Sequence, residues 1–179
     1  MSNDDLFVYL DRHRDDRGIM ATLRCALVPA KRHQAWPLLA RRFGGLQANE
    51  HRARTVQMIA GFYALHPPSS DLSQTAKNLG DLCRHLIGDD ERVKLDLAEG
   101  VGPISRRFQH LLAADGEEIF DRVLRFVLRA KAEVIALDYR QLYQDLLQWQ
   151  DHADWVRVRW ARSFWAPEVQ EPQAQEDAP

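Results

Sequence analysis

Apolar side chains recur along most of this chain at the three- and four-residue spacing of a helix, and sustained strand-like alternation is absent. In the segment from about 49 to 65, Val56, Ile59, Ala60 and Tyr63 fall on one face. The same spacing returns in the later segments, most clearly around Trp160. This pattern is typical of amphipathic helices that bury one face. The sequence therefore predicts an all-α fold.

Helix start and stop signals divide the chain into about nine to ten helices in two packed lobes. Possible capping boxes open helices at Ser2 and at Asp115, and Asp138 is a further N-cap. Pro37 fits its helix only if that helix effectively starts there. The expected helices span about 2–14, 18–26, 33–43, 49–65, 73–87, 90–98, 103–113, 115–130, 138–149 and 153–165.

Proline, serine and charge mark the boundaries between larger units. The loop His66-Pro-Pro-Ser-Ser is the best lobe boundary, which gives an N-terminal helical lobe with a basic surface over 1–66 and a C-terminal helical lobe over 67–165. Residues 166–179 are rich in Pro, Glu and Gln and are expected to form a disordered acidic tail.

Charge is unevenly distributed. The formal net charge is −2, from 24 basic and 26 acidic residues, but the tail contributes four acids and no base, so the rest of the chain has 24 against 22 and carries about +2. The segment from Arg17 to Arg54 contains eight basic residues and only one acidic residue, Glu50. A positive region in a nearly neutral protein suits a polyanion partner, although a solvated basic face is the simpler alternative.

Several classes of protein are disfavoured. No run of about 18 apolar residues would span a membrane, and the acidic start Met-Ser-Asn-Asp-Asp is unlike a signal peptide. Cys25 and Cys83 lie in separate helical stretches, so we expect two buried free thiols in a reducing, cytoplasmic setting rather than a disulfide.

The seven histidines form no familiar metal or catalytic motif. Cys83 and His85 point about 200° apart around a helix and do not easily share a metal. The acids Asp115, Glu117 and Glu118 stand at a helix start, where the macrodipole favours negative charge. Glycine-rich phosphate loops and nucleophile elbows are absent. We expect no catalytic site, no cofactor and no metal.

Arginine is the polar residue that stands out in the second half. Arginines recur along helices whose opposite faces are apolar: Arg106, Arg107, Arg122, Arg125, Arg129, Arg157, Arg159 and Arg162. Repetition over several helices favours contacts with a nucleic-acid backbone, whereas one such helix would be an ordinary solvated face. Trp149 and Trp160 lie on apolar stripes, so we assign them to the core rather than to base stacking.

The order and spacing of scattered motifs in the last third resemble those of a known family. These motifs are Ser105-Arg-Arg-Phe108, Leu111-Leu-Ala-Ala-Asp115, Leu137-Asp-Tyr139, Leu146-Leu-Gln-Trp149 and Val156-Arg-Val-Arg-Trp-Ala-Arg-Ser-Phe-Trp165. The N-terminal half agrees more loosely, through Ala21-Thr-Leu-Arg24 and Asn78-Leu-Gly80. Together they look like the small subunit of the type I-E CRISPR surveillance complex Cascade, the CasB family.

The resemblance implies a non-catalytic structural subunit made of two helical lobes. It also implies partners: the crRNA-bearing backbone subunits, the large subunit, a second copy of the chain, and the target and non-target DNA strands. In such a complex, base pairing to the guide supplies sequence recognition, and the protein needs only to neutralise phosphates. Carried over by position, the resemblance assigns these contacts to Arg24, Arg52, Lys77, Arg125, Arg129, Arg157 and Arg159.

Two other interpretations stay open. A helical adaptor or regulatory module could bind only proteins, with its arginines solvated; a salt-dependent shift on single-stranded nucleic acid separates the two. A hydrolase built from scattered His and Asp residues is the third interpretation.

The sequence departs from the family pattern at one assigned position. Cys25 and Ala26 follow Arg24 where family members often carry a second basic residue, which predicts a weaker contact there.

Overall fold

The computed structural model describes residues 4–43, 49–68, 75–96 and 102–166, and the expected features at Ser2 and in the tail lie outside these ranges. In chain order its α-helices are α1 (Asp4–Arg12), α2 (Arg17–Arg24), α3 (Trp36–Leu39), α4 (Glu50–Leu65), α5 (Leu79–His85), α6 (Asp89–Asp96), α7 (Pro103–Leu112), α8 (Glu118–Ala132) and α9 (Tyr139–Trp165). The all-α prediction is confirmed.

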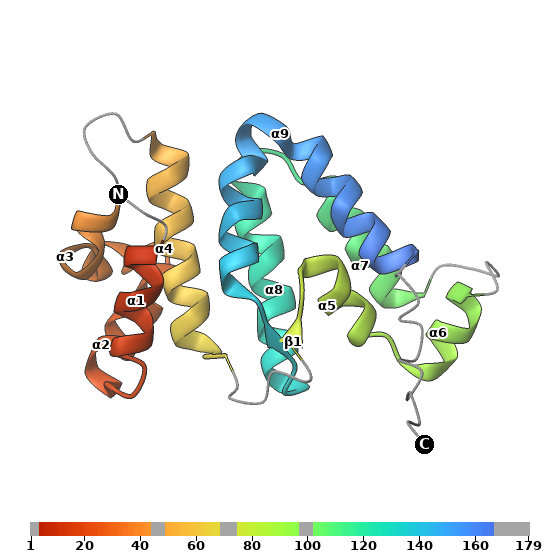
Figure 1. Ribbon diagram of the computed structural model, residues 1–179, viewed down its shortest axis with the longest axis horizontal. Helices are drawn as coiled ribbons and strands as arrows, with labels where there is room; N and C mark the ends of the chain where they lie inside the picture. Colours follow the sequence, from red (N-terminus) through yellow and green to blue (C-terminus); the bar gives the residue numbers. More distant parts are fainter. Residues whose placement is uncertain (1–3, 44–48, 69–74, 97–101, 167–179) are drawn as a thin grey trace, which may run out of the picture.

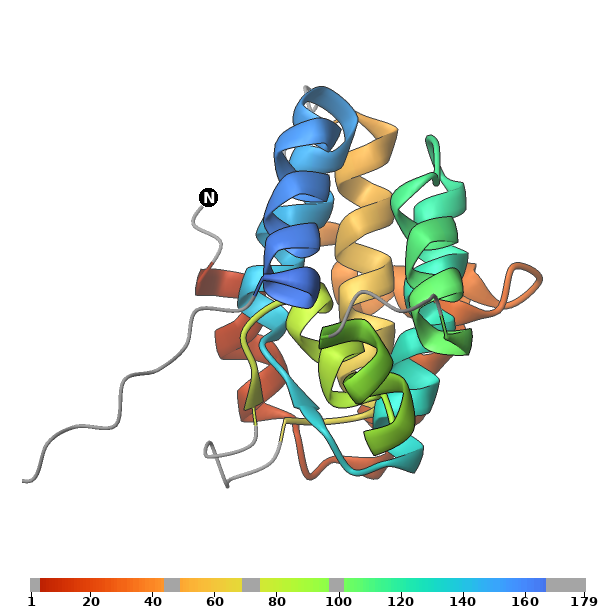
Figure 2. The same cartoon turned by 90° about the vertical axis from the view of Figure 1, so that its right-hand side faces the viewer.

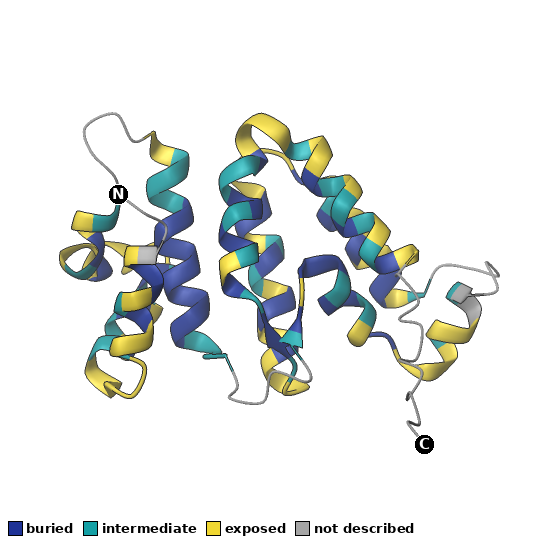
Figure 3. Cartoon of the chain, viewed as in Figure 1, coloured by how far each residue is buried: buried dark blue, intermediate teal, exposed yellow. Residues whose placement is uncertain are grey.

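The helices form two neighbouring groups with a shared core. Figure 1 shows α1–α3 beside α4 on one side of the molecule and α5–α8 on the other, with α9 between and above them. Helix α4 packs against α2, α8 and α9, and α9 packs along α5. Turned by 90°, the long helices stand side by side (Figure 2). Buried residues line the facing sides of these helices (Figure 3), so one apolar cluster runs through both groups.

Helix α4 is the central helix, and its sequence explains why. Every residue from Thr55 to Ala64 is buried, so this helix has partners on all sides rather than one apolar stripe. At its start, Asn49 caps the helix by accepting a hydrogen bond from the backbone N–H of Arg52 at 2.8 Å. A helix that is apolar all round belongs in a core.

A minimal sheet replaces part of an expected helix. Strand β1 (Thr75–Ala76) pairs in parallel with β2 (Ala136–Leu137), with Thr75 opposite Ala136. The predicted helix over 73–87 is therefore wrong at its start, because Asn78 caps α5 by accepting from the N–H of Asp81 at 3.1 Å. Two residues are too few to produce a visible alternation in a sequence.

The segment predicted as one helix over 33–43 is split into short turns. A 3₁₀ turn, η2 (Arg32–Ala35), leads into α3, and another, η3 (Ala40–Arg42), follows; an earlier one, η1 (Cys25–Leu27), extends α2. Pro37 does lie in the first turn of α3, where its missing N–H costs nothing.

The last two predicted helices join end to end as α9. Asp138 caps α9 as expected, accepting from the N–H of Gln141 at 2.9 Å. The backbone of His152 is non-helical, with φ −137° and ψ 37°, and bends α9 sharply. In Figure 1 the two halves form an inverted V.

The predicted capping box at Asp115 is wrong. Helix α8 begins after Glu117, and among the described residues the side chain of Glu117 makes no capping hydrogen bond. The carboxylate of Asp115 instead pairs with Arg157 from α9, at 3.2 Å.

Both cysteines are free, as expected. Cys83 is buried, but Cys25 is only partly buried, contrary to the prediction.

Candidate nucleic-acid interface

A groove of about 750 Å³ lies between α7 and α8 and collects arginines of both helices. Spacing along α8 explains this, because residues three and four apart share a helix face. The groove is lined by Arg107 and His110 of α7 and by Glu118, Asp121, Arg122, Arg125, Phe126, Leu128 and Arg129 of α8. Four arginines against two carboxylates leave a formal charge of +2 with the histidine neutral.

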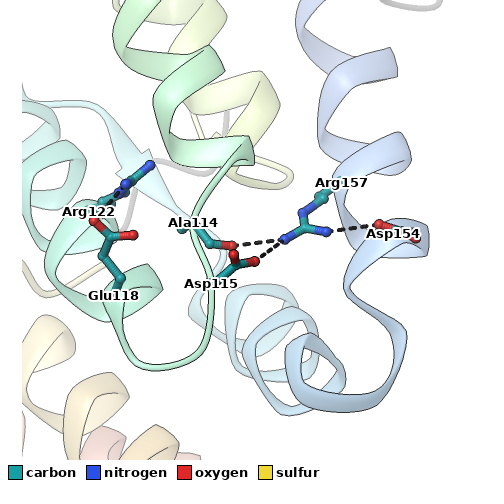
Figure 4. A network of polar contacts seen from close by, with 6 residues as sticks. All are labelled: Ala114, Asp115, Glu118, Arg122, Asp154 and Arg157. Carbon is teal, nitrogen blue, oxygen red and sulfur yellow. Dashed lines mark hydrogen bonds and ion pairs between the residues drawn. The ribbon is translucent and has the colours of Figure 1, made fainter.

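Arg122 lies partly buried in this groove, with a side chain 23% exposed. One of its amino groups, Nη2, donates to Oε1 of Glu118 at 2.6 Å (Figure 4). That hydrogen bond is the main reason why the pKa of Glu118 is lowered. The other, Nη1, is buried and has no hydrogen-bond partner within the described ranges. A buried guanidinium N–H without an acceptor is costly. Because Nη1 has almost no accessible surface, an external acceptor can reach it only if the side chain moves.

Arg125 and Arg129 present their charges on the open side of the groove. Both are exposed, and between them Leu128 keeps 48% of its surface in solvent. Phe126, in contrast, is almost fully buried. The groove thus combines a cationic rim with a small apolar floor. Exposed arginines of this kind suit phosphate because their planar fork matches phosphate oxygens and keeps its charge at any physiological pH.

Arg157, in contrast, is held by the fold. Its Nη1 donates to Asp154 at 2.9 Å, and its Nη2 donates to the carbonyl oxygen of Ala114 at 2.9 Å and to Asp115 at 3.2 Å (Figure 4). The guanidinium also lies 5.1 Å from the ring centre of Trp149. It therefore fastens the second half of α9 to the turn between α7 and α8.

Arg159 pairs with a carboxylate that is fully buried. It donates to Oδ1 of Asp145, a carboxylate with no exposed surface, and its guanidinium stacks 4.2 Å from the ring centre of Trp155. Burial lowers the pKa of Arg159. The family resemblance assigned Arg157 and Arg159 to phosphate contacts, but the structure places both guanidinium groups in contacts within the chain.

The remaining assigned residues lie outside the α7–α8 groove. Arg24 is exposed at the end of α2, where its Nε donates to the carbonyl oxygen of Met20 at 3.2 Å. Arg52 is partly buried in the first turn of α4. Lys77 is exposed between β1 and α5, and its backbone N–H donates to Asp81 at 2.9 Å. Among the seven assigned residues, the groove brings together only Arg125 and Arg129.

Arg107 and Arg122 are groove residues that the positional assignment left out, although both belong to the recurring arginine pattern. The signal that finds them is spacing: Glu118, Arg122, Arg125 and Arg129 follow one another at four, three and four residues. This places them on one face of α8. Only the packing of α7 against α8 shows that Arg107 joins them.

Other chemistry finds little support in the part of the chain that the structure describes. No three His, Cys, Asp or Glu side chains gather there closely enough to hold a metal ion. Burial raises the pKa of the Cys83 thiol well above its usual value, so this cysteine is a poor nucleophile. Within the same residues, no helix is both long and apolar enough to cross a membrane.

Comparison with known proteins supplies the relatives of this chain. A comparison with curated protein sequences gives no match. The structure of CasB from M. ruber superposes with a TM-score of 0.67 at 25% identity, covering 91% of this chain and 92% of that one. A CRISPR-associated protein of the Cse2 family from Thermus thermophilus gives 0.63 at 26% identity, covering 92% and 98%.

A second structure from Thermus thermophilus, described as CasB, is 21% identical and shares the fold with a TM-score of 0.64, covering 92% of this chain and 98% of that one. The sequence model of the CRISPR-associated protein Cse2 matches residues 20–165, which include every helix from α3 to α9 and the groove between α7 and α8. This chain belongs to the Cse2 family of CRISPR-associated proteins.

Proposed function

We propose that this chain is the non-catalytic small subunit of a type I-E CRISPR Cascade complex in the cytoplasm, where it stabilises the target and displaced DNA strands through sequence-independent backbone contacts. Family membership supports a role as a Cascade subunit. The observation that carries the nucleic-acid role is the α7–α8 groove, where four arginines from two helices line one surface with two carboxylates. Its partners would be the crRNA-bearing backbone subunits, the large subunit and a second copy of itself.

The proposed contacts fall into two groups with different roles. The groove residues Arg107, Arg122, Arg125 and Arg129 form one surface for phosphates, and the exposed Arg24 and Lys77, with Arg52, extend the basic surface elsewhere. Arg157 and Arg159 can contact a phosphate only through guanidinium N–H groups that are not already donating within the chain. Reversing their charge should therefore lower the melting temperature as well as the affinity.

The test uses the assembled complex with Arg125→Glu and Arg129→Glu in this subunit. Each lost phosphate contact should weaken DNA binding similarly for all sequences and make the slope of log K against log salt shallower by about 0.7 to 0.9. Arg12→Glu, an exposed arginine on α1, is the matched control and should leave both quantities unchanged.

Two outcomes would contradict the proposal. If the groove variants keep the wild-type affinity and salt slope, the chain is better explained as a protein-only adaptor. If the purified chain cleaves labelled DNA or RNA with Mg²⁺, Mn²⁺ or Zn²⁺ and this activity survives repurification, the subunit is an enzyme.

A further inference from the structure

The final segment of the sequence is opposite in charge to the α7–α8 groove. Residues 167–179 contain Glu168, Glu171, Glu176 and Asp177 and neither Lys nor Arg, so their side chains carry a charge of −4. The groove carries a formal +2 from its arginines and carboxylates. The two therefore attract each other wherever the chain lets them meet.

The segment starts beside α7, one of the two helices that line the groove. Helix α9 ends at Trp165, whose ring lies 5.3 Å from the ring of Phe108 on α7. Arg107, the preceding residue of α7, lines the groove. Helices α7 and α8, at 10 and 15 residues, are about 15 and 22 Å long. A chain running from 167 to 179 spans at most about 45 Å, which exceeds the length of either helix, so its later carboxylates, Glu176 and Asp177, have the reach to enter the groove.

The chemistry of the groove fits carboxylates as well as phosphates. The exposed forks of Arg125 and Arg129 can donate to either anion. The apolar surface of Leu128 offers a contact for Val169 and the prolines of the segment. Attachment to the same chain supplies an effective concentration on the order of millimolar, so a weak site is enough for occupancy.

We infer that the acidic segment 167–179 occupies the arginine-lined α7–α8 groove of its own chain and competes there with nucleic-acid phosphates. The competing role rests on the proposed function, whereas the occupancy does not. A short or isolated nucleic acid loses this competition, because the tethered carboxylates are always present. A long duplex held by the other subunits displaces them, since it supplies many phosphates at once. The segment thus weakens the binding of short, non-specific nucleic acids to the groove.

The first measurement needs no nucleic acid. NMR spectra of the full chain are compared with those of a variant in which the acids are neutralised (Glu168→Gln, Glu171→Gln, Glu176→Gln and Asp177→Asn). We expect amide signals of α7 and α8 around Arg107, Arg125 and Arg129 to move at low salt and to converge at high salt. The control Asp89→Asn with Asp90→Asn, two exposed carboxylates of α6, should leave those signals in place. Unchanged groove signals in the neutralised tail variant would overturn the inference.

The second measurement is affinity for a single-stranded oligonucleotide. Neutralising the tail should tighten binding about three- to tenfold at low salt, and this gain should vanish when Arg125→Gln and Arg129→Gln remove the groove charges. A gain that persists without those arginines would mean simple long-range repulsion, and the inference would be wrong while the proposed function stands. If groove signals move but no variant binds the oligonucleotide or DNA in the assembled complex, the occupancy is supported, and both the competition and the proposed function fail.

Discussion

The indole Nε1 of Trp160 donates a 2.6 Å hydrogen bond to Oδ2 of Asp145, a residue 15 positions earlier on the same helix. The two residues face each other only because α9 bends at His152. Oδ1 of Asp145 accepts from Gln141 at 2.7 Å and from Arg159. One buried carboxylate therefore holds the two halves of α9 together.

Replacing Asp145 by alanine should destabilise the protein by about 2 to 3 kcal/mol, because the buried indole N–H of Trp160 loses its acceptor and the partly exposed guanidinium of Arg159 loses its ion pair. The measurement is urea unfolding followed by circular dichroism. Asp154→Ala is the control: Asp154 pairs with Arg157 but is 94% exposed, so its loss should cost at most about 1 kcal/mol. Equal losses for the two variants would contradict the role of Asp145.

Periodicity predicted the helices, but it did not predict this network. Arg159 stands at the edge of the stripe formed with Trp160, where arginine is usually solvated, and Asp145 has no distinguishing neighbour in the sequence. Their contact depends on the angle between the two halves of α9, which no spacing in the sequence encodes. The groove was predictable in part, since the spacing of Arg122, Arg125 and Arg129 puts them on one face.

Other differences have the same origin in tertiary contacts. The two-residue strands β1 and β2 are too short to leave a pattern, and they pair only because the segments meet in space. Asp115 resembles a capping residue by its position, but Arg157 from a distant helix engages its carboxylate. Local signals predicted where most of the helices lie, whereas the partners of the charged side chains could be identified only from the structure.

Gly80 lies where α5 passes close to the backbone of α9. A Cβ at this position would stand 1.9 Å from the carbonyl oxygen of Trp160, which is backbone and cannot rotate away. Gly80→Ala should therefore lower the free energy of unfolding by about 3 kcal/mol or more, at the upper end of the costs of overpacking. Thermal melting checks this value.

Gly18 provides the matched control, because it is also the second residue of a helix, α2. Within the described parts of the chain, a Cβ there would meet only Oδ1 of Asp16, at an ordinary distance of 3.4 Å. Gly18→Ala should stabilise the protein by up to about 1 kcal/mol through helix propensity. If both alanine variants change stability in the same direction, the close approach at Gly80 does not determine the effect.

Val134 ends α8 in a backbone conformation that favours glycine. Its φ is +57°, and it stands at the turn where the N–H of Ile135 donates to the carbonyl oxygen of Ala130 at 2.9 Å, as in a Schellman motif. A β-branched residue at positive φ is strained by roughly 1 to 2 kcal/mol. Part of the gain from Val134→Gly is offset by the freer unfolded chain, so we expect a net stabilisation of about 0.5 to 1 kcal/mol.

The comparison for Val134 is Val93, another exposed valine, in the middle of α6. Val93→Gly should destabilise the protein by a few tenths of a kcal/mol, because glycine is the poorer helix former. Opposite signs for the two Val→Gly substitutions, measured by chemical unfolding, are the expected result. A loss of stability at both positions would show that the side chain of Val134 contributes more than its backbone costs.

The protein should lose stability in alkaline solution through its buried tyrosines. Burial raises the pKa of both Tyr63 and Tyr139, and the hydrogen bond from Tyr63 to Asp11, at 2.6 Å, adds to the shift at Tyr63. In the unfolded chain these phenols ionise near pH 10, whereas in the folded chain they keep their protons. Above about pH 10 the unfolded state therefore binds fewer protons, and the free energy of unfolding falls as the pH rises.

Tyr139→Phe isolates one of these contributions. The phenol of Tyr139 donates to the carbonyl oxygens of His66 at 2.7 Å and Phe62 at 3.3 Å, so its loss should cost about 1 kcal/mol at pH 7. Between about pH 10 and 12, however, the variant should decline less steeply than the wild type, by up to about 1.4 kcal/mol per pH unit. Urea unfolding at pH 7, 10 and 11 measures both quantities. Parallel declines would show that the phenol of Tyr139 ionises as readily in the fold as outside it, which its burial between α4 and α9 opposes.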